Sequence, residues 1–282
     1  MKGEREMSLE EPLMRMIINL SNSVPIPENE YLGEDGFLHC SACHAKTQTK
    51  IKILGRERIV RCICQCRQKE IDAHKKQDEE KEIERRRKIC FTGTDMKDWN
   101  FDNDDLKNPV LSATMKRYVD NFEEHRQNGV GILMWGGCGT GKTYYAACIA
   151  NELITKGYSV HMTNFATLIN RIQGTFDEKQ DVINDLNRYS LLIIDDLGAE
   201  RRSEYMQETV FNIIDARYRA GKPLIITTNL SIDEIKNPQS VNHGRIYDRI
   251  IERCFPIHVD GNSRRRERVK QSYHEMKRKL GL

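Results

Sequence analysis

The sequence predicts an α/β protein whose parallel sheet is covered by helices on both faces, preceded by a small cysteine-bearing domain and a charged helical linker. From about Phe91 onward, short aliphatic runs alternate with helical segments, a pattern typical of parallel sheets buried on both faces. A glycine-rich motif, Gly136 to Thr143, joins one of these runs to a helix. Five of the nine cysteines lie between residues 40 and 66. These three observations predict the fold class.

The overall composition sets limits on the class of protein. A chain of 282 residues is longer than the usual single domain, and we expect three parts, at residues 1–66, 67–94 and 95–282. Charged residues make up 31% and the net charge is +3, so composition alone does not argue for nucleic-acid binding. There is no apolar run of membrane-spanning length, and the first residues carry acids where a signal peptide would be apolar. We therefore expect a cytoplasmic protein without a membrane partner.

The first 38 residues predict little regular structure. The stretch "LEEPLMRMIINL" is compatible with a short helix, and "SNSVPIPENEYLGEDG" has the composition of a turn-rich polar connector.

The clustered cysteines predict a zinc site. "HCSACHAK" contains a C-x2-C pair, and "VRCICQCRQ" contains three alternate cysteines. Two such knuckles about twenty residues apart are typical of a zinc ribbon, in which four thiolates hold Zn²⁺ tetrahedrally. The segment "TKIKILGRERIV" between them predicts a β-hairpin around Gly55. We expect a structural zinc held by Cys40, Cys43, Cys64 and Cys66, with Cys62 as the alternate and His39 or His44 less favoured.

Residues 67–89, "RQKEIDAHKKQDEEKEIERRRKI", are charged almost throughout, with both signs interleaved. This pattern predicts a solvated helix that links two domains.

The remaining chain contains five candidate strands: residues 130–135, 158–163, 189–195, 222–229 and 254–260. Between them, "KTYYAACIANELITKG" predicts a helix with Ala146, Ala150 and Leu153 on one face, ended by Gly157. "SEYMQETVFNIIDARYRAG" predicts another helix, which ends near Gly221. Residues 262–282 predict one basic amphipathic helix.

The motif "GGCGTGKT" satisfies G-x-x-x-x-G-K-[ST] in the strand–loop–helix context that the chemistry requires. Glycines allow backbone N–H groups to surround phosphates, Lys142 can reach the β- and γ-phosphates, and the Thr143 hydroxyl can bind Mg²⁺. The helix N-terminus adds partial positive charge. We therefore expect ATP and Mg²⁺ as cofactors. The predicted nucleotide-binding residues are Gly136, Gly137, Cys138, Gly139, Thr140, Gly141, Lys142, Thr143 and Tyr144.

Polar residues follow two later strands. In "LLIIDDLGAE" an aliphatic run ends in Asp195 and Asp196, and a carboxylate next to a buried strand needs a metal or a partner. Asp195 is the expected Mg²⁺ ligand, and Asp196 is either the base that orients the attacking water or a turn residue. Asn229, at the end of "LIITTN", could align the water or sense the γ-phosphate.

The motifs "GGCGTGKT", "LLIIDDLGAE", "LIITTNLS", "GRIYDRIIERC" and "GNSRR" occur in this order over residues 95–270. Through these motifs and their order, the chain resembles the AAA+ ATPases of the helicase-loader family, the DnaC type and its transposition relative IstB. The resemblance implies a five-stranded parallel sheet in which the "LIITTN" strand lies between the "VGILM" and "LLIID" strands.

The same resemblance implies roles for arginines. Arg249 matches the arginine finger that reaches the γ-phosphate of a neighbouring subunit, with Arg245 as the second candidate, and Arg265 matches the sensor arginine of the last helix. Many AAA+ proteins have Asp-Glu where this chain has Asp195-Asp196, so a shorter base predicts slow, switch-like hydrolysis. The sequence after "GNSRR" leaves room for one helix and no separate helical lid.

The function implied by the resemblance is an ATPase that loads a hexameric, DnaB-type replicative helicase onto single-stranded DNA during replication initiation. The zinc-bearing N-terminal region would bind the helicase, and the ATPase domains would assemble into an ATP-bridged oligomer. The alternative is an IstB-type ATPase helper of a DNA transposase. The N-terminal zinc region favours the loader.

Overall fold

The computed structural model describes residues 26–53, 55–173, 179–198, 204–238 and 240–281. It divides into two compact units, residues 1–80 and 81–282. The predicted domain boundaries, after residues 66 and 94, stay predictions, since the division between the units falls inside a helix. No helix in the described ranges is both long and apolar enough to cross a bilayer.

The first unit contains two small antiparallel ribbons. Strand β1 (Glu30–Leu32) pairs with β2 (Leu38–Cys40), and β3 (Gln48–Ile53) pairs with β4 (Arg56–Arg61). The β3–β4 hairpin around Gly55 confirms the prediction, and Gly55 has the positive φ of +78° that the turn requires. The expected polar connector was partly wrong, because it contains β1, which the backbone pairing with β2 stabilises. The short helix expected at "LEEPLMRMIINL" lies outside the described residues.

The charged segment forms helix α2 (Gln65–Cys90), as predicted. Its last part belongs to the second unit, where Cys90 is fully buried in the core. Glu82 pairs with Arg85 and with Arg86, and the guanidinium of Arg86 also donates to the carbonyl oxygen of Gly157 in the second unit. An otherwise polar helix thus ends with a few apolar residues that anchor it to the second unit.

The second unit is built on a five-stranded sheet with the order β6-β7-β8-β5-β9. The strands are β5 (Gly131–Trp135), β6 (Val160–Asn164), β7 (Leu191–Leu197), β8 (Leu224–Thr228) and β9 (Cys254–His258). All paired strands are parallel. The five predicted strands and the central place of β8 between β5 and β7 are confirmed.

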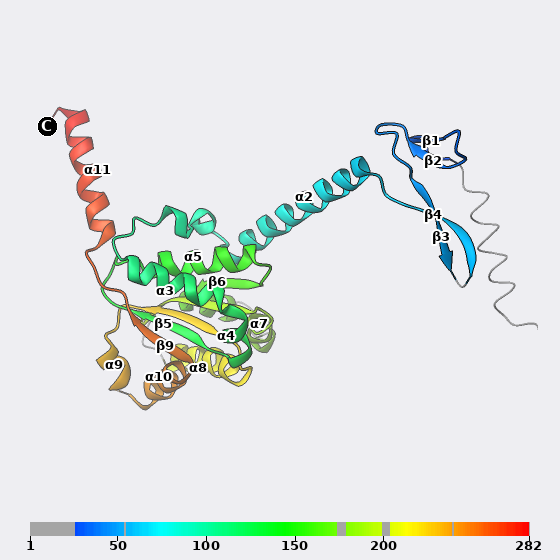
Figure 1. Ribbon diagram of the computed structural model, residues 1–282. Helices are drawn as coiled ribbons and strands as arrows, with labels where there is room; N and C mark the ends of the chain where they lie inside the picture. The colour runs from blue at the N-terminus through cyan, green and yellow to red at the C-terminus, as the bar shows by residue number, and fades with distance from the viewer. Residues whose placement is uncertain (1–25, 54, 174–178, 199–203, 239, 282) are drawn as a thin grey trace, which may run out of the picture. The chain divides into compact units, whose positions relative to one another are not determined.

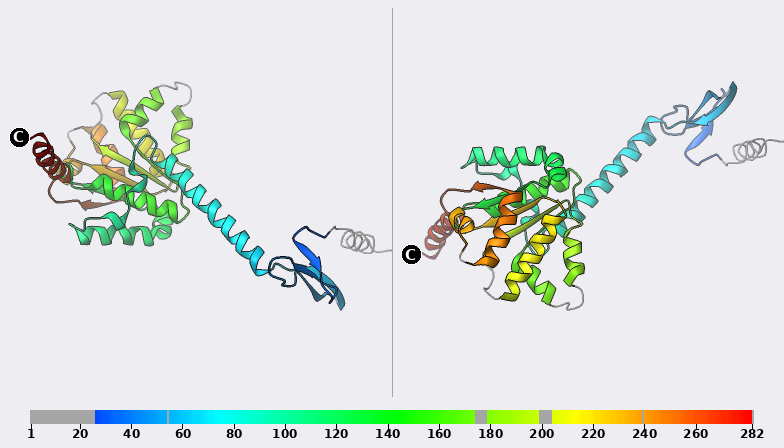
Figure 2. Two further views of the ribbon diagram at one scale, coloured as in Figure 1. Left: turned by 90° about the horizontal axis from the view of Figure 1, so that it is seen from above. Right: turned by 90° about the horizontal axis from the view of Figure 1, so that it is seen from below.

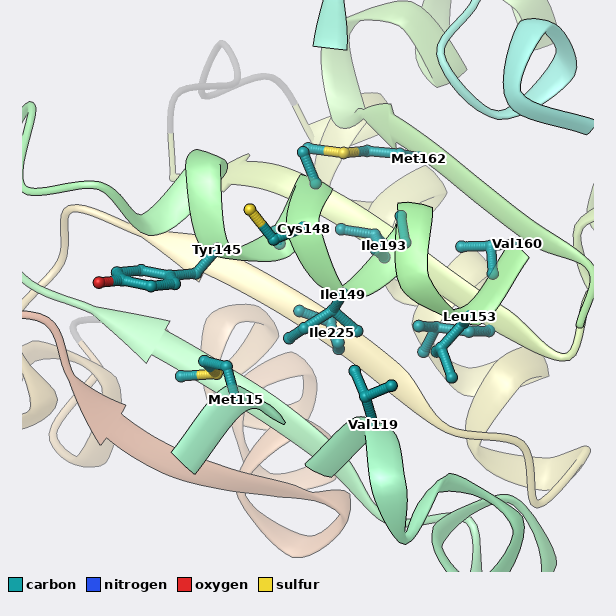
Figure 3. Packing of buried hydrophobic residues seen from close by; sticks show 14 of the residues in the cluster. Met115, Val119, Tyr145, Cys148, Ile149, Leu153, Val160, Met162, Ile193 and Ile225 are labelled. Carbon is teal, nitrogen blue, oxygen red and sulfur yellow. The ribbon is translucent and has the colours of Figure 1, made fainter. Parts of the chain in front are cut away.

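Helices cover both faces of this sheet (Figures 1 and 2). On one face, α3 (Pro109–Asp120) and α5 (Lys142–Thr155) pack on Ile132, Ile193 and Ile225. Figure 3 shows Ile149 and Leu153 of α5 in this layer together with Met115 and Val119 of α3. Alternate strand residues, such as Leu192 and Ile226, face the opposite layer. That layer contains α6 (Phe165–Gln173), α7 (Lys179–Leu186), α8 (Glu204–Arg219) and α10 (Val241–Arg253).

Short elements complete the unit: η1 (Met96–Asp98), η2 (Phe101–Asn103), α4 (Phe122–Asn128) and α9 (Ile232–Lys236). The final helix, α11 (Arg264–Leu280), confirms the prediction of one helix after "GNSRR". Its apolar residues Val269, Tyr273, Met276 and Leu280 are all more than half exposed. Their helical spacing therefore predicted the helix correctly, although no packing within the described chain covers the apolar stripe.

Candidate functional site

The loop between β5 and α5 has a backbone that only glycine accommodates at two positions. Gly136 has φ +145°, and a Cβ there would lie 2.4 Å from the carbonyl oxygen of Val259. Gly139 has φ +81°, and a Cβ there would lie 2.3 Å from Oγ of Ser263. The carbonyl oxygen of Gly139 also accepts a hydrogen bond from the backbone N–H of Arg264. The glycine-rich loop is therefore packed against the start of α11, which brings the last helix to this edge of the sheet.

Lys142 is buried at the start of α5, and its ammonium group makes three hydrogen bonds. Nζ donates to the carbonyl oxygens of Gly136 at 2.8 Å and Gly137 at 2.7 Å. It also donates to Oδ1 of Asn229 at 2.7 Å. Burial lowers the pKa of Lys142, while the nearby acidic groups, Asp196 and Asp195 among them, act to raise it. Asn229, predicted from the end of its strand, thus lies next to the lysine of the loop.

Asp195 forms the centre of a polar cluster at the end of β7. Thr143 Oγ1 donates to its carboxylate at 3.0 Å, and Thr227 Oγ1 donates to Oδ1 at 2.5 Å. Burial raises the pKa of Asp195, and these hydroxyl groups counteract the effect. The two residues predicted to bind magnesium, Thr143 and Asp195, are therefore adjacent. Hard oxygen donors of this kind suit Mg²⁺, and a bound dication would offset the cost of the buried carboxylate.

Asp196 differs from Asp195 in conformation and exposure. It is exposed and has φ +58°, in the left-handed region that few residues other than glycine adopt. Its N–H donates to Thr227 Oγ1 at 3.0 Å, where the register between β7 and β8 shifts. This irregularity turns Asp196 away from its neighbour, and it lines the cavity next to Lys142. Strained backbone of this type is concentrated at functional sites.

The loop, the ends of β7 and β8, and the start of α11 enclose a cavity of about 350 Å³, a size within the usual range of ligand pockets. Its lining residues are Trp99, Asn103, Asp105, Cys138, Gly139, Gly141, Lys142, Thr143, Tyr144, Asp196, Asn229, Arg264 and Arg265. Gly136, Gly137 and Thr140 do not line it. They shape the loop instead, through the carbonyl bonds to Lys142 and a bond from Thr140 Oγ1 to the Gly137 carbonyl oxygen.

Four residues that line the cavity were not predicted from the sequence: Trp99, Asn103, Asp105 and Arg264. Arg264 forms an ion pair with Asp105 at 3.0 Å and stands in a run of three arginines whose members spacing cannot distinguish. Trp99 packs against Tyr144, with 5.7 Å between the ring centroids. It belongs to a segment, "DWNFDND", that carries no motif. The sequence indicated Thr227 only as one of the polar residues at the end of "LIITTN", without its bond to Asp195.

The predicted finger arginines lie on α10, outside the residues that line the cavity. Arg249 Nε donates to Asp215 Oδ1 at 2.7 Å, whereas Arg245 is exposed. Arg265, the predicted sensor, does line the cavity and contributes to the lowered pKa of Lys142. The roles assigned to these arginines stay predictions.

The first unit brings four cysteines together. The Sγ atoms of Cys40, Cys43, Cys64 and Cys66 all lie within 4.8 Å of one another, with Cys66 Sγ 3.3 Å from that of Cys40 and 3.1 Å from that of Cys64. Hydrogen bonds from the backbone N–H groups of Cys43 and Ala42, together with those from the thiols of Cys66 and Cys64, lower the pKa of Cys40. Four thiolates at this separation would repel one another unless a cation lies between them, and the set matches the ligands of a structural zinc site.

The alternate zinc ligands considered from the sequence do not face the four-cysteine cluster. Cys62 Sγ faces the carbonyl oxygen of Lys46 at 3.5 Å. His39 has one ring nitrogen 2.9 Å from the His44 carbonyl oxygen and the other 3.0 Å from Asp35, and Nδ1 of His44 faces the Tyr31 hydroxyl. The cluster therefore contains the four cysteines that were predicted from the sequence, without the alternates.

Comparison with known proteins identifies relatives of this chain. The model of the IstB-like ATP binding protein family matches residues 68–272. The replicative helicase loader DnaI of Bacillus subtilis (strain 168) is 25% identical over 210 residues, which cover 70% of this chain and 68% of DnaI. The replicative helicase loader DnaC of Escherichia coli (strain K12) is 31% identical over 124 residues, which cover 43% of this chain and 49% of DnaC. The match thus spans about half the length of DnaC.

Solved structures agree with this fold. A crystal structure of DnaI superimposes with a TM-score of 0.51 at 23% identity, covering 64% of this chain and 99% of that one. A crystal structure of the DnaC helicase loader gives a TM-score of 0.51 at 26% identity, covering 57% of this chain and 97% of that one.

Proposed function

The chain belongs to the family of IstB-like ATP-binding proteins, and we propose that it is an ATPase that loads a replicative helicase onto single-stranded DNA. The observation that carries the proposal is the convergence of Lys142, the Thr143–Asp195 pair and Arg265 on one edge of the sheet. The similar proteins named above are replicative helicase loaders, which favours loading over the alternative, an IstB-type helper of a transposase.

In this proposal the site binds ATP with Mg²⁺. Lys142 binds the β- and γ-phosphates, exchanging its bonds to carbonyl oxygens of the loop for bonds to phosphate oxygens. Thr143 and Asp195 hold the metal, which supplies positive charge to the phosphates when it is bound. Asp196 orients the attacking water, and Asn229, already within 2.7 Å of Lys142 Nζ, aligns it. Arg265 senses the γ-phosphate within the same subunit.

We expect hydrolysis to be slow and switch-like. The Asp196 side chain is one methylene shorter than glutamate, and its backbone is held by Thr227, so the carboxylate has limited reach toward the water. A basal turnover on the order of hundreds per second would contradict this expectation.

The four cysteines would hold one structural zinc, which replaces the core that a unit of this size lacks. The zinc-bearing unit is the proposed helicase-binding part. The ATPase units would assemble with ATP at their interfaces. Arg249, or Arg245 in its place, would contact the γ-phosphate of the ATP bound by the next subunit.

The experiment that tests the function is a pull-down of the full chain against two purified partners, the hexameric replicative helicase of the same organism and a DNA transposase. We expect retention of the helicase. A matched Lys142→Ala chain should lose the ATP-dependent release of the helicase onto single-stranded DNA. Retention of the transposase alone would instead support the IstB-type alternative.

A further inference from the structure

A buried carboxylate on α8, Asp215, lies between two arginines. Its side chain is 5% exposed. Oδ1 accepts from Nε of Arg249 at 2.7 Å, and Oδ2 accepts from the guanidinium of Arg219. Each oxygen thus serves a different arginine. Arg219 is 76% exposed and lies on the same helix, whereas Arg249 comes from α10 and is 29% exposed.

The guanidinium of Arg249 is fixed on several sides. Nη1 donates to the carbonyl oxygen of Arg245 at 3.1 Å, and the group lies over the ring of Phe211, with 4.7 Å between the guanidinium carbon and the ring centroid. Within the described ranges of the chain, Nη2 makes no hydrogen bond. The bonds through Nε and Nη1 therefore leave the donors of Nη2 available, and a guanidinium can offer such donors to a phosphate oxygen.

The neighbouring candidate is arranged differently. The side chain of Arg245 is exposed, and in the part of the chain that the structure describes it has no ion pair or hydrogen bond. Ordering a free arginine at a phosphate costs conformational entropy, which a preorganised guanidinium avoids. The geometry thus distinguishes the two arginines that the sequence left as alternatives.

We infer that Asp215 is a positioning residue for Arg249, holding its guanidinium in the orientation in which it reaches the γ-phosphate bound by a neighbouring subunit. The inference rests on the proposed function, in which Arg249 acts in trans. Arg219 occupies only the second carboxylate oxygen, so the bond from Arg249 to Oδ1 does not depend on it.

A subunit-mixing experiment tests this inference in the full chain. The acceptor is the Arg249→Ala chain, which keeps its own ATP site but cannot supply an arginine finger to a neighbouring subunit. The donor is the Lys142→Ala chain, which offers its finger but does not bind ATP. Mixing the two should restore ATP turnover on the acceptor. Adding Asp215→Asn to the donor should reduce the restored kcat by about tenfold or more, whereas adding Arg219→Ala should leave it unchanged, because the bond from Arg249 to Oδ1 remains.

Each outcome separates the inference from the proposed function. If the Lys142→Ala donor restores nothing, the ATP-bridged assembly in the proposed function is wrong, and the inference falls with it. If the Asp215→Asn donor restores turnover as fully as its parent, the assembly stands and the positioning role is wrong.

A purely structural role for Asp215 would also affect the Asp215→Asn single variant, so its melting temperature and ATP affinity are measured alongside. If this variant does not fold, a Phe211→Leu donor takes its place, because it removes the ring beneath the guanidinium and leaves Asp215 intact. Reduced restoration is then expected, and full restoration would overturn the inference.

Discussion

Replacing Thr227 by valine tests the polar cluster around Asp195. The Thr227 hydroxyl donates to Asp195 Oδ1 at 2.5 Å and accepts from the Asp196 N–H at 3.0 Å. Its side chain is fully buried. Valine has nearly the same shape but makes neither bond, so Thr227→Val removes the hydroxyl without opening a cavity.

The expected cost follows from these two bonds. A hydrogen bond to a charged group contributes about 1.5–3 kcal/mol and a neutral one about 1 kcal/mol. Their loss should lower the free energy of unfolding by about 2.5–4 kcal/mol, which is less than the stability of a typical domain, about 5–15 kcal/mol. The chain should therefore still fold. With one support of its carboxylate gone, Asp195 should also hold Mg²⁺ less well, and we expect the affinity for ATP in the presence of Mg²⁺ to fall about tenfold, or about 1.4 kcal/mol.

Two measurements check this expectation. Urea titration gives the free energy of unfolding, and calorimetry gives the ATP affinity with Mg²⁺ and with a chelator. The matched control is Thr228→Val. The Thr228 hydroxyl is equally buried but bonds to the carbonyl oxygen of Leu197 and the N–H of Leu230. The Thr228→Val variant should therefore be less stable than the wild type but should bind ATP in the presence of Mg²⁺ with unchanged affinity. If Thr227→Val changes neither quantity, or if both variants weaken ATP binding equally, the reasoning about Asp195 is wrong.

Four further predictions concern single side chains. Lys142→Ala should weaken ATP binding by at least about a hundredfold, since a charge-assisted contact to two phosphates is lost; unchanged affinity by calorimetry would refute the assignment of the loop. Asp196→Asn should bind ATP normally and stop turnover in a phosphate-release assay, whereas continued turnover would make Asp196 only a turn residue. Native mass spectrometry should find one zinc per chain, lost in Cys64→Ser and kept in Cys62→Ser; zinc retained in both would exclude Cys64 as a ligand. Burial acts to raise the pKa of Asp215, but the bonds from Arg219 and Arg249 outweigh it and the net pKa lies below 3.8. A lowered pKa in the folded state contributes stability above the unfolded value that is lost as the pH falls. The stability difference between wild type and Asp215→Asn should therefore shrink below about pH 4 in urea titrations, and a constant difference would contradict this.

The sheet was predictable because its signal is local. Each strand is a short run rich in aliphatic residues, and the place of β8 between β5 and β7 followed from the resemblance carried by the motifs. The glycine-rich loop was equally clear, since the required positive φ angles at Gly136, Gly139 and Gly141 restrict the residues that can occupy them. The cluster of four cysteines was predicted because the short spacings within each cysteine group are typical of zinc ribbons. Strand β1 was missed because three residues with no alternation leave no periodic signal.

The sequence by itself determined features that depend on neighbours in the chain: the five strands of the large sheet, the glycine-rich loop, the Asp195–Asp196 pair and the four clustered cysteines. Only the tertiary structure decided which distant groups complete the site. Thr227 reaches Asp195 because β7 and β8 are adjacent in the sheet, and Arg264 reaches the loop because α11 begins against Gly139. Asp215 meets Arg249 because α8 packs on α10. The physical reason is that side-chain contacts between segments depend on how the helices pack on the sheet, and a linear pattern of residue types does not contain that information.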